Sequence, residues 1–314
     1  MEILIIGAGA MGGLFGALLA PWANVCLMTT NSAHAAAIRQ KGVQLTDMEG
    51  NTSCASVQII THPDHYSKRA DLVLICTKAG ATSKAAETAQ AILADQGLVL
   101  TLQNGLGNLE RIAERVGHKR ATAGTTAQAA TLFAPGHIRH AGQGPTTLAP
   151  AKGCPEQLHI LATMSKLFNQ AGIATTLTED IDALLWSKLI VNVGINALVA
   201  LLRIPNGALI DTQESQALMT DAVEEALAVA QALGINLDLT IQQERVRQVC
   251  ELTRSNRASM LQDILRGQAT EIDVINGAIV HKGREVQIPT PINALLTRLI
   301  KALESTSAQR IDAI

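Results

Sequence analysis

The chain has 314 residues, a formal net charge of -2 at pH 7 and 47% hydrophobic residues. This length allows two domains of roughly 150 residues each, and the hydrophobic content excludes a largely disordered chain. A charge near zero offers no basic surface for nucleic acid, so the composition argues against a nucleic-acid-binding protein.

The first half of the chain alternates short apolar runs with helix-like stretches, the pattern of a parallel sheet with crossover helices. Apolar runs predict strands at 2–6, 24–28, 71–76 and 98–102. Between them the periodicity predicts helices at 11–20, 32–41, 80–94 and 107–116. The sequence therefore predicts an α/β domain at the N-terminal end.

The residue pattern changes twice after this region. Between about 120 and 150, short Thr, Gly and His segments predict antiparallel strands and turns, and a helix at 155–170 and a strand at 173–177 would close the domain. From Glu179 onward, apolar helical periodicity replaces the strand signals. It predicts helices at 183–202, 213–233 and 292–305, and a helical pair over 239–283. We therefore expect a domain boundary between 178 and 179.

The stretch GAGAMG follows the first predicted strand and opens a helix, which is the setting of a dinucleotide-binding glycine loop. Gly7 would make the tight turn, Gly9 would let a pyrophosphate approach the backbone, and Gly12 would let helix and strand pack closely. The helix N-terminus would supply N–H groups to the phosphates. A glycine turn in an α/β domain that binds no cofactor is the alternative.

An NAD-preferring site would place an acid at the end of the second strand, where it binds the ribose 2′-OH. Here the acid after Glu2 is Asp47, and the strand ends in CLMTTNSAH. We expect Ser32 to cap the next helix, whose N-terminus would favour an anion. The missing carboxylate favours NADPH, although no arginine stands in this loop to hold the 2′-phosphate.

Two polar residues follow further strands at the edge where doubly wound sheets bind ligands. Lys78 lies in CTKAG and Asn104 in LQNGLGN. Each has an ordinary alternative, because a lysine in a turn is commonly only solvated and Asn-Gly is a common turn. For each residue, ligand binding and the ordinary structural role therefore both stay open.

The helix predicted at 183–202 carries Lys188, Asn192 and Asn196 four residues apart, on one face of an otherwise apolar helix. A membrane span is disfavoured, since a central lysine costs roughly 2.5 to 3.5 kcal/mol on insertion scales. A hydrogen-bonded core network and the lining of a ligand site are the two alternatives that remain. We call these three residues the polar stripe.

The cysteines are scattered without a C-x-x-C spacing, and neither HPDH nor HIRH has a second pair of ligands. We therefore expect no metal site. The opening MEILIIGAGAMGG is not typical of a signal or transit peptide, so the cytoplasm is the expected location.

Five stretches in chain order resemble the ketopantoate reductase (2-dehydropantoate 2-reductase) family: GAGAMG, CTKAG, QNGLGN, LLWSKLIVNVGINAL and SMLQDILRGQATEIDVING. The resemblance runs over nearly the whole chain. It implies a Rossmann NADP-binding domain over 1–178 and an all-helical domain over 179–314, like that of 6-phosphogluconate dehydrogenase. It also implies that NADPH, or alternatively NADH, reduces ketopantoate to pantoate in pantothenate and coenzyme A biosynthesis.

The resemblance implies a role for each residue that matches a motif of the family. Lys188 would be the general acid that protonates the substrate oxygen as the hydride arrives, and burial would lower its pKa toward neutrality. The residues expected to bind substrate are Asn104, Asn192, Asn196, Asn206, Asn256 and Ser259. Those expected to bind cofactor are Gly7, Ala8, Gly9, Ala10, Met11, Gly12, Thr30, Lys78, Asn104, Ala130 and Glu271.

Three of these residues have ordinary structural roles as alternatives. Asn256 and Ser259 could cap or solvate a helix end, and Glu271 could complement a helix dipole in a first turn. Family members often carry an arginine near position 30, where this chain has Thr30. An NAD-dependent hydroxyacid dehydrogenase and a dinucleotide-binding sensor without catalysis are therefore alternatives. The expected partner is a small 2-oxo acid, with no nucleic acid or membrane, and a homodimer stays open.

Overall fold

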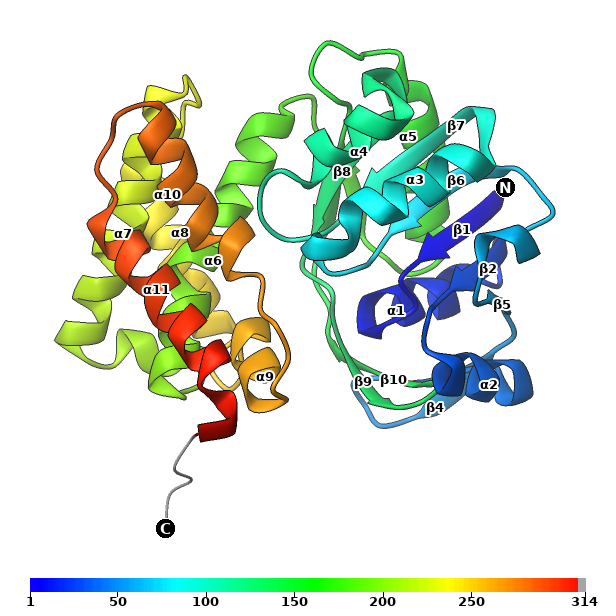
Figure 1. Cartoon of the computed structure of the whole chain (residues 1–314), viewed down its shortest axis with the longest axis horizontal. Helices are drawn as coiled ribbons and strands as arrows, with labels where there is room; N and C mark the ends of the chain where they lie inside the picture. The colour runs from blue at the N-terminus through cyan, green and yellow to red at the C-terminus, as the bar shows by residue number, and fades with distance from the viewer. Residues whose placement is uncertain (310–314) are drawn as a thin grey trace. The chain divides into compact units, whose positions relative to one another are not determined.

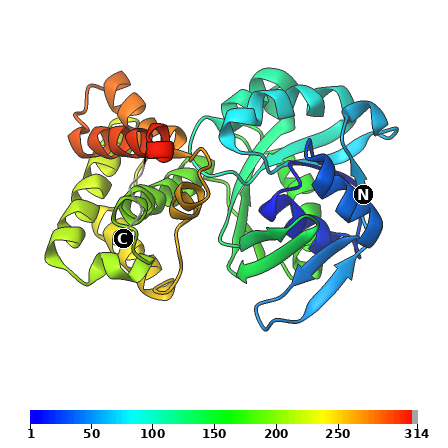
Figure 2. The same cartoon turned by 60° about the horizontal axis from the view of Figure 1, so that its bottom comes forward.

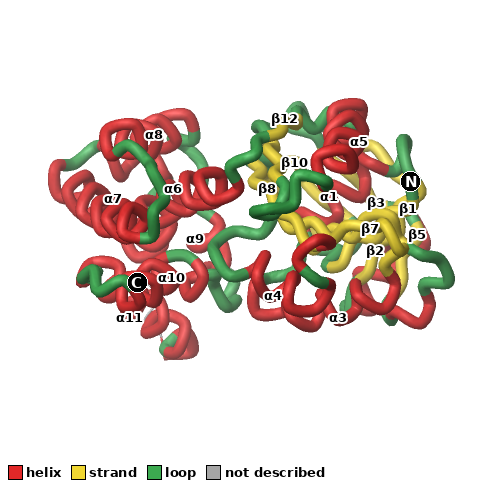
Figure 3. The backbone as a smooth tube through the Cα atoms, turned by 90° about the horizontal axis from the view of Figure 1, so that it is seen from above, coloured by secondary structure: helices red, strands yellow, loops and turns green. Residues whose placement is uncertain are grey.

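The computed structural model describes residues 1–309, and its internal contacts divide the chain into two compact units. The first unit contains Met1–Gln103 and Gly107–Leu184, and the second contains Asn104–Leu106 and the chain from Leu185 onward. The boundary that we expected between 178 and 179 stays a prediction. Figure 3 shows the strands gathered in one unit and helices alone in the other.

The main sheet of the first unit has the strand order β12-β11-β8-β7-β6-β1-β2-β5. All neighbouring strands are parallel except β11 and β8. The run from β5 to β8 reproduces the order 3-2-1-4-5-6 of doubly wound dinucleotide-binding sheets. The strands are β1(Glu2–Ile6), β2(Asn24–Met28), β5(Gln58–Ile60), β6(Ala70–Ile75), β7(Leu93–Thr101), β8(Ala121–Thr126), β11(Thr146–Ala149) and β12(Thr175–Leu177).

Helices cover both faces of this sheet because successive side chains of a strand point to opposite sides. Ile3 and Ile5 of β1 pack into one core, and Leu4 and Ile6 pack into another. Residues of α1, α2 and α5 join the first core, whereas residues of α3 and α4 join the second (Figure 1). These helices are α1(Ala10–Leu19), α2(Ser32–Lys41), α3(Thr82–Ile92), α4(Asn108–Val116) and α5(Gln157–Gln170). The predicted α/β Rossmann-type unit is confirmed.

A second, four-stranded sheet has the order β4-β3-β10-β9. Its strands are β3(Val43–Thr46), β4(Thr52–Ala55), β9(Ala129–Ala134) and β10(His137–Gly142). Figure 2 shows the blue hairpin of β3 and β4 beside the green strands β9 and β10. The antiparallel texture predicted for 120–150 is confirmed by the pairs β9–β10 and β8–β11. The sequence did not predict β3 and β4, which are short and, in β4, largely exposed.

The second unit is helical, as predicted, with α6(Ile181–Leu202), α7(Gln213–Ala232), α8(Leu239–Leu252), α9(Ser259–Leu265), α10(Asn276–Glu285) and α11(Pro291–Ser305). A short 3₁₀ helix, η4(Asn206–Ile210), follows α6. The helical pair predicted over 239–283 is wrong, because three α-helices and the 3₁₀ turn η5(Ile272–Val274) occupy that range. Polar stretches at 253–258 and 266–271 interrupt the apolar pattern there.

Helix α6 is the one described helix whose length and composition would allow it to cross a membrane. Its most apolar 18-residue window has a mean hydropathy of 1.7, and 67% of that window is buried inside the protein. A core helix has the same properties. The burial of α6 therefore accounts for its apolar composition.

Candidate active site

The glycine loop joins the ends of three parallel strands. The N–H groups of Gly7 and Ala8 both donate to the Met28 carbonyl at the end of β2, at 2.9 and 3.1 Å. Gly7 has a φ of +100°, and a Cβ there would lie 2.7 Å from the Thr77 nitrogen just beyond β6. Only glycine suits that turn, as the sequence predicted.

Gly9 and Gly12 differ in the space around them. A Cβ on Gly12 would lie 2.1 Å from the Gly7 carbonyl oxygen, so glycine there allows helix α1 to pack against the loop. A Cβ on Gly9 would meet no described atom within 4 Å. The backbone at Gly9 is therefore open to a ligand, and α1 begins directly after it with Ala10 and Met11. The free N–H groups of this first turn suit a phosphate.

The segment after β2 departs from our prediction in one detail. Asn31, rather than Ser32, is the N-cap of α2, since its Oδ1 accepts a hydrogen bond from the His34 N–H at 2.9 Å. Ser32 is the first helical residue. Thr30 is exposed between the strand and this cap. Thr30 therefore lies at the carboxyl end of β2, the location from which a Rossmann unit contacts the adenosine ribose.

Two further candidates of the first unit lie on different elements. Lys78 is exposed and precedes the 3₁₀ turn η2(Ala79–Ala81) at the carboxyl end of β6. Ala130 lies on β9, opposite His140 of β10. The structure thus places Lys78 at the ligand edge of the main sheet and Ala130 in the second sheet.

The polar stripe lies on helix α6. Asn196 is buried, with 6% of its surface exposed, while Lys188 and Asn192 are half-buried. Burial lowers the pKa of Lys188 from 10.5 to about 8, and the negative charge of Glu271 opposes that shift. A lysine with this pKa holds a proton at neutral pH and can release it readily, which suits a general acid.

The amide of Asn192 gives a second indication of a ligand. Its Nδ2 atom is buried and finds no hydrogen-bond partner among residues 1–309. A buried donor without an acceptor costs about 1 to 3 kcal/mol. The stripe therefore presents an unused donor one helical turn from Lys188.

Glu271 does not complement the dipole of helix α10 from its first turn, the ordinary role that the sequence left open. Helix α10 begins only at Asn276, so Glu271 is not in its first turn. Instead, Glu271 Oε2 accepts a hydrogen bond from Asn104 Nδ2 at 3.3 Å. The Leu106 N–H donates to the Val274 carbonyl at 3.0 Å. Asn104–Leu106 is thereby fixed to the segment that carries Glu271.

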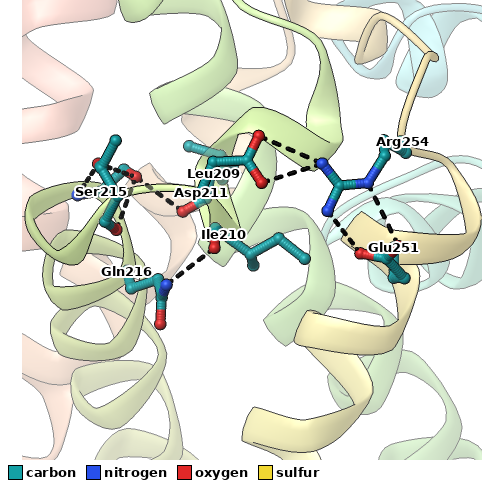
Figure 4. Close-up of polar contacts among 8 residues, drawn as sticks. Leu209, Ile210, Asp211, Ser215, Gln216, Glu251 and Arg254 are labelled. Carbon is teal, nitrogen blue, oxygen red and sulfur yellow. Dashed lines mark hydrogen bonds and ion pairs between the residues drawn. The ribbon is translucent and has the colours of Figure 1, made fainter.

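Asn206 and Asn256 are brought together by backbone contacts. The Asn206 N–H donates to the Asn256 carbonyl at 3.0 Å, and the Gly207 N–H donates to the Arg254 carbonyl at 3.1 Å. Ionic contacts support this arrangement, as Figure 4 shows: the Arg254 guanidinium binds Asp211 after η4 and Glu251 in the last turn of α8. The start of η4 is therefore held against the turn that follows α8.

Thr253 sets the orientation of the Asn206 amide. The Thr253 hydroxyl donates to the Val249 carbonyl at 2.6 Å, so toward Asn206 Nδ2, 2.9 Å away, it acts as the acceptor. Asn206 Oδ1 is then the free end, and it is buried without a partner in the described part of the chain. Sequence reasoning missed Thr253, because nothing in ELTRSN distinguishes it from a surface threonine.

Ser259 and Asn256 are both exposed. Ser259 is the first residue of α9, whose N-cap is Ala258, so Ser259 does not supply the cap that the sequence left open. Across residues 1–309 no group of three or more His, Cys, Asp or Glu side chains is arranged to hold a metal ion.

The pKa of Lys188 leads to a pH prediction. If Lys188 donates the proton in a carbonyl reduction, as the family resemblance implies, the reaction needs the protonated amine, which prevails below the pKa of about 8 and is lost as the pH rises through it. We therefore expect kcat/KM for reduction to fall about tenfold per pH unit above pH 8, and the reverse oxidation to rise over the same range. Initial rates from pH 6 to 10, with circular dichroism to verify folding, test this. A flat profile to pH 10 contradicts it.

A glycine-loop Rossmann unit, followed by a helical unit whose polar stripe carries a half-buried lysine of lowered pKa, is typical of an oxidoreductase that uses a nicotinamide dinucleotide. Comparison with known proteins is more specific. The family model described as Ketopantoate reductase PanE/ApbA matches residues 3–153, and that described as Ketopantoate reductase PanE/ApbA C terminal matches residues 180–304. The chain belongs to the ketopantoate reductase family.

Individual relatives match over nearly their whole length. The chain is 37% identical over 309 residues to the 2-dehydropantoate 2-reductase of Pyrococcus horikoshii, which covers 97% of this chain and 98% of that protein. A PanE/ApbA family ketopantoate reductase from Ralstonia eutropha JMP134 is 32% identical with a TM-score of 0.87, covering 98% and 100% of the two chains. D-mandelate dehydrogenase in its ternary structure with NADH and anilino(oxo)acetate is 27% identical with a TM-score of 0.92, covering 98% and 99%.

Proposed function

We propose that this protein is an NADPH-dependent 2-dehydropantoate 2-reductase, which reduces ketopantoate to pantoate in pantothenate and coenzyme A biosynthesis. The observation that carries the proposal is the pair of unused amide atoms, Asn192 Nδ2 and Asn206 Oδ1, in the unit that contains Lys188. Its relatives named 2-dehydropantoate 2-reductase support the same activity.

The first unit would bind the dinucleotide. The open backbone at Gly9 and the start of α1 would receive the pyrophosphate, with Gly7, Ala8, Ala10, Met11 and Gly12 forming the loop. Thr30 would contact the adenosine ribose region, and Lys78 and Ala130 would contact the rest of the cofactor. Asn104 and Glu271, which belong to the second unit, would also contact the cofactor. The bound nicotinamide supplies the hydride. NADPH is favoured because no carboxylate follows β2 to repel a 2′-phosphate.

The second unit would bind the substrate and supply the proton. As hydride reaches C2, negative charge builds on the ketone oxygen, and the Lys188 ammonium would stabilise that charge and donate a proton to it. Asn192 Nδ2 would donate to an oxygen of the 2-oxo acid, and Asn196 would assist it. Asn256 and Ser259, both exposed, would receive the carboxylate.

Asn206 favours a hydroxylated substrate. Its free Oδ1 is an acceptor, so a ligand group beside it must be a donor, and a carboxylate or a ketone oxygen is not. Ketopantoate carries a 4-hydroxyl group that can donate. A site built around such a bond discriminates strongly against an analogue that lacks the hydroxyl.

The direct test is a spectrophotometric assay of the purified protein with ketopantoate and either NADPH or NADH. We expect oxidation of the cofactor, with a higher kcat/KM for NADPH. If neither cofactor is oxidised with ketopantoate while other branched 2-oxo acids react, the substrate assignment is wrong. A higher kcat/KM for NADH would overturn the cofactor assignment alone.

We predict that Asn206→Ala raises the KM for ketopantoate about tenfold, the effect of losing one hydrogen bond to the substrate hydroxyl. The KM for 3,3-dimethyl-2-oxobutanoate, which lacks that hydroxyl, should stay near its wild-type value. Steady-state kinetics with both substrates test this, and Asn236→Ala, at an exposed asparagine before α8, is the matched control. Equal losses on both substrates would show that Asn206 does not contact the hydroxyl.

One observation favours a second candidate. D-mandelate dehydrogenase, whose structure contains NADH, matches with a TM-score of 0.92. No lysine or arginine lies between Met28 and Arg39 to bind a 2′-phosphate, and His34 is buried. An NADH-dependent reductase of another bulky 2-oxo acid is therefore the alternative, and the same assay distinguishes it. We further propose that the protein is located in the cytoplasm. Its partner would be the small-molecule 2-oxo acid, and a homodimer stays possible.

A further inference from the structure

A buried amide network in the helical unit contacts α6, the helix that carries the polar stripe. Asn276, which begins α10, and Asn293, near the start of α11, are both 0% exposed. Asn276 Nδ2 donates to Asn293 Oδ1 at 3.0 Å and to the Val193 carbonyl of α6 at 3.3 Å. Val193 lies between Asn192 and Asn196 in the chain. Asn276 therefore fastens α10 to the helix that carries the stripe.

The partners of the two amides determine which way each amide faces. Asn293 Nδ2 lies 3.0 Å from the Ala222 carbonyl and 2.8 Å from Glu225 Oε2, and both of these oxygens can only accept. The opposite atom of Asn293 is therefore the oxygen, so Asn276 must turn its Nδ2 toward it. Asn276 Oδ1 then remains buried with no partner anywhere in the described chain.

That unpaired oxygen indicates a role for the amide beyond packing. A buried acceptor without a donor destabilises the fold, and an apolar side chain of similar size would avoid this cost. The amide compensates for this cost with the two hydrogen bonds that Asn276 Nδ2 donates. One goes to the Val193 carbonyl of α6, and the other goes to Asn293 Oδ1, whose own amide nitrogen is bonded to α7.

Glu225 anchors the network at its far end. Its carboxylate accepts the Ile292 N–H at 2.7 Å and the Asn293 N–H at 2.9 Å, at the beginning of α11. Helices α6, α7, α10 and α11 are consequently joined around Asn276 and Asn293.

Glu271 lies just before Asn276 in the chain, at the other end of the short turn η5. The Glu271 carbonyl accepts the N–H groups of Val274 and Ile275 at 3.1 and 3.2 Å, so one tight turn separates Glu271 from Asn276. Within residues 1–309, Glu271 is the charged group whose field raises the pKa of Lys188 against the effect of burial. A change in the position of this turn would change the distance between the Glu271 carboxylate and the Lys188 amine.

We propose that Asn276 is a positioning residue, which holds Glu271 at its distance from Lys188 by bonding the start of α10 to Val193 of α6. The inference rests on the proposed function, because the charge of Lys188 matters only if Lys188 is the proton donor. It assigns Asn276 no contact with substrate or cofactor.

A double-mutant cycle between Glu271→Gln and Asn276→Ala tests the proposal without turnover. The readout is the rate at which acetic anhydride acetylates Lys188 at pH 6.5, measured by mass spectrometry relative to the exposed Lys166. Glu271→Gln should raise this rate about threefold in the wild-type background, because loss of the carboxylate increases the neutral fraction of the amine. In the Asn276→Ala background it should change the rate less than about 1.5-fold.

Equal effects of Glu271→Gln in both backgrounds, or no effect in the wild type, would overturn the proposal. Asn276→Leu is the second variant, since it removes the amide together with the unpaired oxygen and keeps a side chain of similar size. Asp238→Ala is the control, because it removes the N-cap contact of α8, where Asp238 Oδ1 accepts the Ile241 N–H at 2.8 Å. It should lower Tm and keep the threefold response.

If Glu271→Gln no longer raises the acetylation rate of Lys188 in the Asp238→Ala background, then any destabilisation of the helical unit abolishes this effect. That result also overturns the proposal. Failure of the proposed function is seen separately, as a wild-type protein that does not oxidise NADPH with ketopantoate, and the acetylation cycle can still be measured on it.

Discussion

Replacement of Lys188 by alanine should lower kcat for ketopantoate reduction about 10³-fold, because the variant lacks both the positive charge beside the developing oxyanion and the proton that neutralises it. Burial lowers the pKa of this amine to about 8, so it can release a proton near neutral pH, which water does not replace. Binding of NADPH should be unchanged. Steady-state kinetics measure kcat, and calorimetric titration measures the affinity for NADPH.

Two further variants separate the contributions of Lys188. Lys188→Arg keeps the charge, but the pKa of a guanidinium is too high for it to donate a proton readily, so we expect the variant to remain at least about 100-fold slower than wild type. Lys166→Ala, at an exposed lysine of α5, should have wild-type activity. Near-normal turnover in Lys188→Ala would remove this residue from the mechanism.

Gly12→Ala should lower both the stability of the first unit and its affinity for NADPH. The added Cβ would lie 2.1 Å from the Gly7 carbonyl oxygen, so α1 or the glycine loop must move. Such overpacking costs about 1 to 3 kcal/mol. The displaced loop should weaken NADPH binding about 100-fold, because the N–H groups that contact the pyrophosphate lose their alignment. Thermal unfolding and calorimetric titration measure the two effects.

Gly9→Ala is the matched variant, since its Cβ would meet no described atom within 4 Å and its φ of -70° is open to alanine. It should keep the wild-type Tm and lose about tenfold in NADPH affinity, because the methyl group would occupy the position where the pyrophosphate approaches the backbone. If Gly9→Ala binds NADPH as wild type does, the cofactor does not approach the loop there.

Local features of the fold were predictable because they depend on neighbouring residues. Strand β2 and helix α2 have the bounds that the sequence predicted, since the apolar run ends at Met28 and the helical period ends at Lys41, before Gly42. The polar stripe was predictable for the same reason. The cap of α2 was misplaced by one residue, because Asn31 and Ser32 are both good caps and the sequence does not decide between them.

Features that depend on distant residues were not predictable. Asn104 and Glu271 are 167 positions apart, and their contact depends on how Asn104–Leu106 packs against η5. The orientation of Asn206 depends on the Thr253 hydroxyl, whose own donor is used within α8. Strand β3 forms a hairpin with β4, and its place in the second sheet depends on pairing with β10, far along the chain. Each of these required the folded structure.

The grouping of Asn104–Leu106 with the helical unit has a consequence for recombination between relatives. Gly105 has a φ of +82°, and a Cβ there would lie 2.3 Å from the Val274 carbonyl oxygen. These three residues and the turn at 271–274 therefore pack as one structural module, although they are encoded far apart. A chimera with a single crossover near residue 184 would combine a tripeptide from one parent with a turn from the other. A functional exchange of helical units has to carry the tripeptide with it.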